Sequence, residues 1–170
     1  MLESLLSHNF TNGPEIEVLI VPCKKTVFRV LLKESLVFSV SFFTHLDPFL
    51  EKNILLWLTA YGNKKTSPLH FLPKQILPAF SAKMLTTLSE VPFGALISYQ
   101  DLAVGGGNPL ASRAAGTFCR KNPFPLLIPC HRIITSSGHL GGFAFGLSIK
   151  KTLLAFEGNS SFLPSQALVN

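Results

Sequence analysis

The residues best suited to chemistry lie together in the segment Pro129-Cys130-His131-Arg132. A cysteine acts as a nucleophile in its thiolate form, and a nearby imidazole or guanidinium group lowers the pKa of the thiol. His131 and Arg132 supply both groups directly after Cys130. Because proline fixes its own φ and favours an extended predecessor, Pro129 should present Cys130 at a bend. The alternative is a small buried structural cysteine, which is the more frequent fate of a free thiol.

Two downstream features can complete such a site. Glu157 ends a predicted helix, where the negative end of the helix dipole disfavours a carboxylate. It can orient a histidine, or it can be an ordinary exposed residue. The loop 141–146, Gly-Gly-Phe-Ala-Phe-Gly, can stack a flat ligand such as a base, or it can be a plain turn with two core phenylalanines.

Other candidate motifs are weaker. The three cysteines Cys23, Cys119 and Cys130 form no CxxC pair and no cluster with histidine, so we expect neither a disulfide framework nor a metal site. Cys23 is interpreted as structural because it has no partner nearby in the sequence. The glycines at 105–107 are not a phosphate loop, because no Lys-Ser/Thr follows them and no buried strand precedes them.

The N-terminal part of the chain predicts a small antiparallel sheet and one helix. Runs of β-branched and aromatic residues separated by polar turns predict strands over residues 16–21, 27–32 and 36–43. Asp47 as N-cap and Pro48 at the first helical position predict a helix that runs to about Tyr61 and stops at Gly62. Residues 62–73 predict a linker.

The C-terminal part predicts mainly helices. Apolar spacing and capping residues indicate helices over about residues 80–91, 99–104, 109–119 and 149–157. The expected caps are Ser98, Asn108 and Ser148 at N-termini and Gly158 at the last C-terminus. The last helix should bury a stripe of Ile149, Leu153 and Phe156. A short helix, a glycine turn and a second helix with basic residues is also typical of a helix-turn-helix, although many helix pairs simply pack together.

Composition favours a globular protein with an anionic partner. The chain of 170 residues is 47% hydrophobic and 14% charged, which excludes a disordered chain and allows one domain or two small ones. Its net charge is +6 with a pI near 9.4, which favours nucleic acid or a membrane surface. Six basic residues but only two acidic residues lie between Pro92 and Gly158, so most of the excess charge accompanies the cysteine motif. With no basic leader and no long apolar run, we expect a cytoplasmic protein without a signal peptide.

Cys130-His131-Arg132 between Pro129 and Ile133-Ile134 resembles the active-site signature of the O6-alkylguanine-DNA alkyltransferases, also called methylated-DNA–protein-cysteine methyltransferases. The resemblance extends from about residue 93 to residue 158. It implies a C-terminal helix-turn-helix that binds the DNA minor groove and turns the damaged nucleotide out of the stack. We therefore expect an α+β fold with a small N-terminal α/β domain and linker (1–73), a mainly helical alkyltransferase domain (74–158) and a tail (159–170).

The resemblance also implies a reaction. The alkyl group, such as methyl, would pass from O6 of guanine in DNA to the sulfur of Cys130, irreversibly and once per molecule, with no cofactor. His131 resembles the base that takes the thiol proton through a water, and Glu157 resembles the carboxylate that orients the histidine. Tyr99 matches the tyrosine that helps rotate the nucleotide and donates to the departing guanine.

DNA contacts follow from the same resemblance. Arg113 matches the arginine that replaces the extruded base, and Asn122 matches the asparagine that bridges to the active-site segment. The complete set of expected DNA-binding residues is Ser112, Arg113, Ala115, Asn122 and Arg132. Double-stranded DNA containing O6-alkylguanine is the expected partner of a monomer that needs no membrane, and action on O4-alkylthymine is left open.

The substrate pocket is expected to involve Pro125, Phe143, Ala144 and Phe145. Phe143 stands where many family members have tyrosine, so a hydroxyl contact to the base would be lost while the stacking face is kept. Phe145 should narrow the pocket against bulky adducts. Two alternatives are a non-catalytic lesion-recognition protein, which the presence of Cys130 argues against, and a Cys-His hydrolase, which would turn over many substrates.

Overall fold

The computed structural model describes the backbone of residues 5–8, 16–20, 28–32 and 38–42, and residues 48–65, 69–70, 76–122 and 124–162. The chain divides into two compact units, one of residues 1–75 with 123–127 and one of residues 76–122 with 128–170. The expectations for Cys23, for Asp47 as an N-cap and for residues 163–170 lie outside the described residues.

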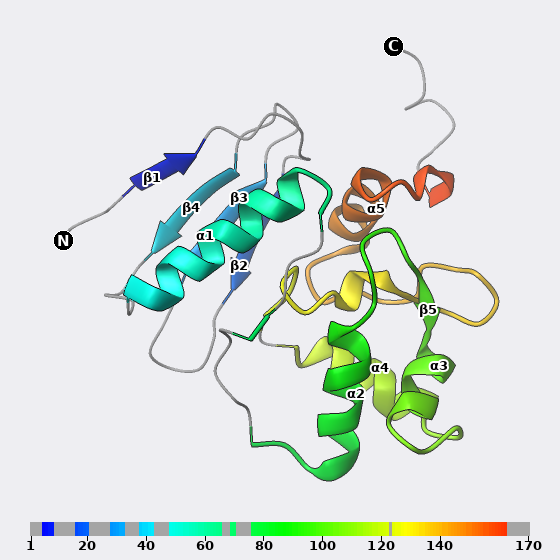
Figure 1. Ribbon diagram of the computed structural model, residues 1–170. Helices are drawn as coiled ribbons and strands as arrows, with labels where there is room; N and C mark the ends of the chain where they lie inside the picture. Colours follow the sequence, from blue (N-terminus) through cyan, green and yellow to red (C-terminus); the bar gives the residue numbers. More distant parts are fainter. Residues whose placement is uncertain are drawn as a thin grey trace. The chain divides into compact units, whose positions relative to one another are not determined.

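The first unit contains a four-stranded antiparallel sheet (Figure 1). Its strands are β1 (Leu5–His8), β2 (Ile16–Ile20), β3 (Phe28–Leu32) and β4 (Phe38–Phe42), in the order β1-β4-β3-β2. Three strands lie within two residues of the predicted runs. Strand β1 was not predicted, because Leu5-Leu6-Ser7-His8 is short and lacks the alternation that marks a half-buried strand.

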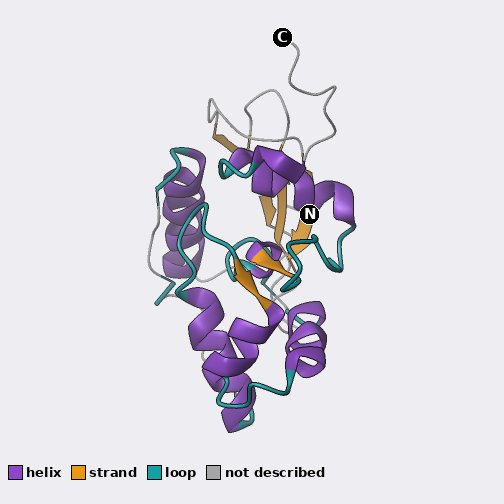
Figure 2. Cartoon of the chain, turned by 90° about the vertical axis from the view of Figure 1, so that its right-hand side faces the viewer, coloured by secondary structure: helices purple, strands orange, loops and turns teal. Residues whose placement is uncertain are grey.

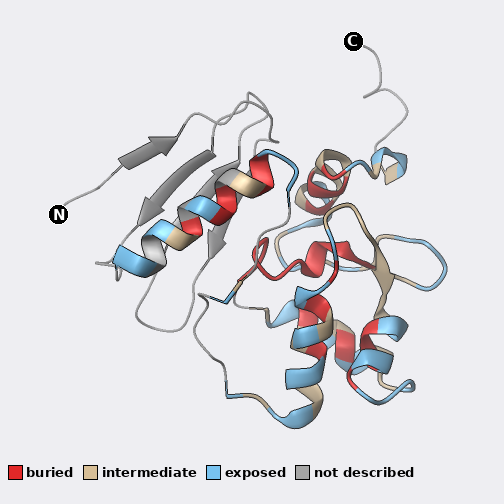
Figure 3. Ribbon diagram, in the orientation of Figure 1, coloured by how far each residue is buried: buried red, intermediate tan, exposed pale blue. Residues whose placement is uncertain are grey.

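Helix α1 (Pro48–Gly62) agrees with the predicted helix of the first unit. It buries Ile54, Trp57, Leu58 and Tyr61, whose spacing of three and four residues places them on one helical face (Figure 3). The rings of Trp57 and Tyr61 stack with centroids 5.3 Å apart. In the described part of the chain, no helix is long and apolar enough to cross a membrane.

The second unit is mainly helical, and Figure 2 shows the helices in purple. Helix α2 (Ala79–Ser89) precedes helix α3 (Tyr99–Gly105). Ser98 is confirmed as the N-cap of α3. Its hydroxyl accepts from the backbone N–H of Asp101, and the Asp101 carboxylate accepts from the backbone N–H of Ser98, which forms a capping box.

The glycine turn after α3 has a packing role. A Cβ at Gly105 would lie 2.3 Å from the Thr87 hydroxyl, and a Cβ at Gly106 would lie 2.5 Å from the Phe80 ring. Both neighbours belong to α2, so only glycine allows α3 to end this close to that helix.

Helix α4 (Ser112–Arg120) begins later than predicted. Its N-cap is Ala111, and Asn108 does not cap it. The side chain of Asn108 accepts a hydrogen bond from the backbone N–H of Leu110, two residues on. This local turn uses the acceptor that the sequence had suggested for a helix cap.

The last helix, α5 (Leu147–Phe156), also differs at its ends. Its N-cap is Gly146 rather than Ser148, and its C-cap is Glu157 rather than Gly158. Gly158 follows with φ of 99°, a conformation that glycine favours. The buried stripe contains Lys150, Leu153 and Leu154, while Ile149 and Phe156 of the predicted stripe are only half-buried. The expected tail begins with a short 3-10 helix, η3 (Ser160–Phe162).

Two short strands pair within this unit. Strand β5 (Ile97–Ser98) pairs in parallel with β6 (Ile133–Ile134). The 3-10 helix η2 (Cys130–Arg132) directly precedes β6. Because β5 leads into α3 and β6 follows η2, this pairing brings the start of α3 close to the cysteine motif.

Candidate active site

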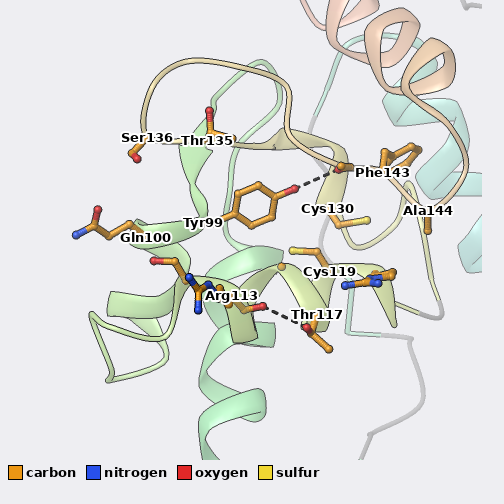
Figure 4. Close-up of a pocket in the computed structure, with 14 residues that line it drawn as sticks. Tyr99, Gln100, Arg113, Thr117, Cys119, Cys130, Thr135, Ser136, Phe143 and Ala144 are labelled. Atoms are coloured by element: carbon orange, nitrogen blue, oxygen red, sulfur yellow. Dashed lines mark hydrogen bonds between the residues drawn. The ribbon is translucent and has the colours of Figure 1, made fainter.

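Cys130 lies in a cavity of about 790 Å³ in the second unit (Figure 4). Helices α3 and α4, η2 and the loops after β6 supply its walls. The side chains that the sequence had pointed to and that line it are Tyr99, Ser112, Arg113, Cys130, Phe143 and Ala144.

The Cys130 thiol is held by Asn122. The Asn122 side-chain amide donates to the Cys130 sulfur at 3.1 Å and to the carbonyl oxygen of Ile128 at 2.8 Å. The backbone N–H of Asn122 also donates to the carbonyl oxygen of Cys119 at the end of α4. Asn122 therefore links α4 to the segment that leads into Cys130.

Glu157 joins both residues that follow Cys130. It lies 2.8 Å from Nε2 of His131, and the guanidinium of Arg132 donates to both carboxylate oxygens at 2.8 and 2.9 Å. All three side chains are buried. Gly94 adds a backbone N–H to Glu157 at 3.2 Å, and Arg132 also donates to the carbonyl of Val91. The carboxylate is thus held by two adjacent side chains, those of His131 and Arg132, and by the backbone of Gly94 from a distant part of the chain.

The environment sets the protonation of this cluster. Burial would raise the pKa of Glu157, but hydrogen bonds and charges from His131 and Arg132 outweigh it and lower that pKa to about 2. Burial lowers the pKa of His131, although Glu157 opposes the shift, so the ring is neutral near pH 7. The lasting ion pair of Glu157 is therefore with Arg132.

This arrangement fixes the tautomer of His131. The ionised Glu157 can only accept, so Nε2 of His131 carries the proton that it donates. Nδ1 is then the basic nitrogen, and among the described residues it has no hydrogen-bond partner. The ring is held in place by one nitrogen while the other can take a proton.

Burial keeps the resting thiol protonated. It raises the pKa of Cys130, and the Asn122 hydrogen bond and the charge of Lys150 oppose that shift only in part. Burial and the neighbouring Cys130 raise the pKa of Cys119 to about 12. A reaction at Cys130 therefore needs a base that removes the thiol proton, whereas an exposed cysteine of lower pKa ionises more readily by itself.

Tyr99 lines the cavity and contacts the glycine–aromatic loop. Its hydroxyl donates to the carbonyl oxygen of Gly142 at 3.1 Å (Figure 4). Burial and the nearby Cys119 thiol raise the pKa of Tyr99, so the hydroxyl keeps its proton. A Cβ at Gly141 would lie 2.7 Å from the Tyr99 ring, so this close approach requires glycine.

Several lining residues were not expected from the sequence. Along α4, Thr117, Cys119 and Arg120 join Gly116 and the expected Ser112 and Arg113 at the cavity. Their spacing of three and four residues marks one helical face, which is a signal that the sequence does contain. Gln100, Thr135 and Ser136 also line the cavity, but no periodic pattern connects them with Cys130.

Comparison with known proteins finds similarity over the part of the chain that contains the candidate site. A family profile described as "6-O-methylguanine DNA methyltransferase, DNA binding domain" matches residues 79–159. A methylated-DNA–protein-cysteine methyltransferase of Homo sapiens is 44% identical over 110 residues, which cover 61% of this chain and 53% of the relative. The similarity of this segment is to the 6-O-methylguanine DNA methyltransferase family.

Solved methyltransferase structures share the fold. Mycobacterium tuberculosis OGT in complex with DNA is similar with a TM-score of 0.57 and 29% identity, over 68% of this chain and 71% of that chain. The O6-methylguanine methyltransferase of the same organism, at 23% identity, shares the fold over 88% of this chain with the same TM-score. The chain spans about half the length of the curated methyltransferases it matches.

In the structure, four of the residues expected at the site have other surroundings. Arg132 is buried and paired with Glu157, so it does not present its guanidinium to DNA. Ala115 is fully buried and cannot contact the minor groove. Pro125 is not among the residues that line the cavity, and neither is Phe145, whose ring instead contacts that of Phe143 with centroids 5.5 Å apart.

The arrangement has the parts of a single nucleophilic site. It contains a thiol, a neutral imidazole with a basic nitrogen, a carboxylate that holds the imidazole, and a tyrosine hydroxyl that lines the same cavity as the thiol. In the described residues, no group of three or more His, Cys, Asp or Glu side chains could hold a metal ion.

Proposed function

We propose that this protein repairs DNA by transferring an alkyl group, methyl above all, from O6 of guanine to the sulfur of Cys130. The proposal is carried by the free Nδ1 of His131, because His131 directly follows Cys130 and Glu157 holds its other nitrogen. The family of residues 79–159 and the relatives' names support the same reaction.

In the proposed step, the Cys130 sulfur attacks the alkyl carbon, and a C–S bond forms as the C–O bond breaks. The thiol proton passes to Nδ1 of His131, through a water, as attack begins. The electron pair of the broken bond stays on the guanine. The Tyr99 hydroxyl leaves its bond to Gly142 and donates to the guanine ring, which stabilises the leaving group.

DNA is the proposed partner, read by a helix-turn-helix of α3 and α4. Arg113 and Arg120 are exposed on α4, and both line the cavity mouth. We infer that Arg113 fills the space of the extruded nucleotide and that the small residues Ser112 and Gly116 allow close approach to the backbone. Flipping is required because a protein nucleophile cannot reach O6 within the duplex.

A thioether does not release its alkyl group, so each molecule should act once. The reaction needs Cys130 as a free thiol, which fits a reducing compartment such as the cytoplasm. We propose that a monomer suffices, because the second unit alone supplies every residue given a role here.

Stoichiometry tests this function. A limiting amount of protein is incubated with excess duplex carrying one O6-methylguanine, and the repaired duplex is counted over time. We expect repair to stop at one equivalent in the wild type and to be absent in Cys130→Ala. Continued turnover would indicate a hydrolase, and tight binding without repair would indicate a recognition protein.

A further inference from the structure

A second buried thiol lines the cavity that holds Cys130. Cys119, in the last turn of α4, and Cys130, on η2, are both free and buried, and both are part of the cavity wall (Figure 4). The proposed alkyl transfer uses only the Cys130 thiol. It leaves Cys119 without a function, although this thiol faces the same space.

Asn122 holds the two cysteines together. Its backbone N–H donates to the carbonyl oxygen of Cys119 at 3.2 Å, and its side-chain amide donates to the Cys130 sulfur at 3.1 Å. One residue therefore bonds to both cysteines, although they belong to different elements. In agreement with this proximity, a charge on Cys130 contributes to the raised pKa of Cys119, after the larger effect of burial.

The cavity has room for a small ligand at the two thiols. Its volume of about 790 Å³ lies within the roughly 300–1,000 Å³ that is typical of small-molecule sites. The rings of Tyr99 and Phe143 and the methyl group of Ala144 also line it, and they offer apolar surface to a neutral ligand. A compact ligand with one aromatic ring is therefore well within the available space.

The side chains present favour a ligand that is satisfied by two sulfur atoms. Cysteine sulfur is a soft ligand and prefers soft, thiophilic partners. Structural zinc takes four ligands, whereas no group of three or more His, Cys, Asp or Glu side chains that could hold a metal occurs in the part of the chain that the structure describes. A trivalent organoarsenical needs only two thiols, because its third bond is to its own carbon.

We propose that Cys119 and Cys130 form a dithiol site that captures neutral trivalent arsenicals and thereby blocks the acceptor thiol. With phenylarsine oxide, two As–S bonds form, and the two thiol hydrogens leave with the oxide oxygen as one water molecule. Arsenic stays trivalent, so no oxidant or reductant takes part. Only the consequence for repair rests on the proposed function, and the capture itself does not.

Titration of the full chain with phenylarsine oxide, followed by native mass spectrometry, tests the capture. We expect the wild type to bind one molecule. Cys119→Ala should bind roughly a hundredfold more weakly, because the second As–S bond forms within one complex and gains from a high effective concentration. Cys23→Ala removes the third cysteine of the chain and is the matched control, which should bind like the wild type.

Protection of Cys130 locates the bound arsenical. In the wild type it should prevent alkylation of the Cys130 peptide by iodoacetamide, and in Cys119→Ala the same concentration should protect much less. Equal affinities of these two proteins, loss of binding in Cys23→Ala, or an unprotected Cys130 in the wild type would overturn the proposal. If Cys119→Ala does not fold by circular dichroism, Cys119→Ser replaces it, and protection equal to that of the wild type would overturn the proposal.

Methyl transfer from an O6-methylguanine duplex connects the dithiol site with repair. Phenylarsine oxide should inhibit the wild type, and dithiothreitol should restore the activity, whereas the same thiol concentration of 2-mercaptoethanol should not, since only a dithiol replaces both As–S bonds at once. Undiminished transfer by the arsenical-bound wild type would overturn the proposed block. If the wild type transfers no methyl group but Cys130 is still protected only when Cys119 is present, the proposed function fails and the dithiol site remains supported.

Discussion

At the scale of single residues, His131 and Glu157 depend on each other. Glu157 fixes which nitrogen of His131 carries the proton, and burial keeps the ring neutral. Arg132 keeps Glu157 ionised in a place where an isolated carboxylate would be unfavourable. The pKa of each group therefore has a measurable consequence.

The first consequence concerns the acid limit of the reaction. His131 must be unprotonated to take the thiol proton, and burial lowers its pKa below the ordinary value of about 6.5. We predict that single-turnover methyl transfer falls on acidification with a midpoint below about pH 6.5. A midpoint at or above that pH would contradict a buried neutral base. His139→Gln, a change to an exposed histidine on a nearby turn, should leave the midpoint unchanged.

The second consequence concerns stability. Because the pKa of Glu157 is about 2 when folded and near 4.3 when unfolded, its stabilisation is complete above about pH 5 and is lost as the pH falls towards 2. Glu157→Gln should lower the free energy of unfolding by on the order of 3 kcal/mol at neutral pH, because it leaves Arg132 buried without its partner.

Urea unfolding at several pH values checks this prediction. The difference between the wild type and Glu157→Gln should shrink between about pH 4.5 and pH 2, as the native carboxylate protonates. Glu90→Gln, which changes an exposed carboxylate at the end of α2, is the control and should have little effect. Equal losses in the two variants would show that the buried pair does not stabilise the fold.

At the scale of elements, the loop after β6 shapes the cavity through its packing. Gly141 allows this loop to touch Tyr99 of α3, and Phe145 supports the ring of Phe143. Neither residue needs to contact the substrate to affect the reaction, because each sets the position of a side chain that lines the cavity.

Gly141→Ala tests the first of these contacts. Gly141 has φ of 65°, and a Cβ there would lie 2.7 Å from the Tyr99 ring. We predict a loss of about 1–3 kcal/mol in the free energy of unfolding and slower methyl transfer, because the backbone is strained and Tyr99 is displaced. Thermal unfolding of each variant measures the loss of stability. Gly142→Ala is the control: a Cβ there meets nothing within 4 Å, so this variant should be less destabilised than Gly141→Ala.

Phe145→Gly tests the second contact. The wild type should react more slowly with O6-benzylguanine than with O6-methylguanine, because the Phe143–Phe145 pair limits the room for a ring. Without the Phe145 ring, Phe143 can move, and we expect the benzyl rate to rise roughly tenfold with little change in the methyl rate. Similar rates for both substrates, unchanged in the variant, would refute this explanation of the pocket.

At the scale of the whole molecule, the sequence predicted what local rules determine. Helices α1, α2 and α3 follow from apolar spacing and from local signals such as Ser98 and Gly62. The predicted start of α4 was wrong because an asparagine side chain can either cap a helix or close a local turn. The side chain of Asn108 closes a turn. Strand β5 was missed because two residues carry no pattern.

The partners of buried charges could not be predicted in the same way. The family resemblance placed Arg132 among the expected DNA-binding residues, and no acidic residue lies close to it in the sequence. Its partner Glu157 lies 25 residues further on, and the partners of Lys150 are backbone carbonyl groups, which no residue type reveals. Such contacts depend on how helices and loops pack, and the sequence pattern records only local structure.

The most direct test of the central claim is to locate the transferred methyl group. Protein is incubated with a duplex carrying one O6-methylguanine, and intact mass and peptide mapping follow, with Cys130→Ala and Cys119→Ala as matched variants of two buried thiols in one cavity. We predict one methyl group, on Cys130, in the wild type and in Cys119→Ala, and none in Cys130→Ala. An unmodified wild-type protein, or a methyl group on any other residue, would contradict the assignment of Cys130 as the acceptor.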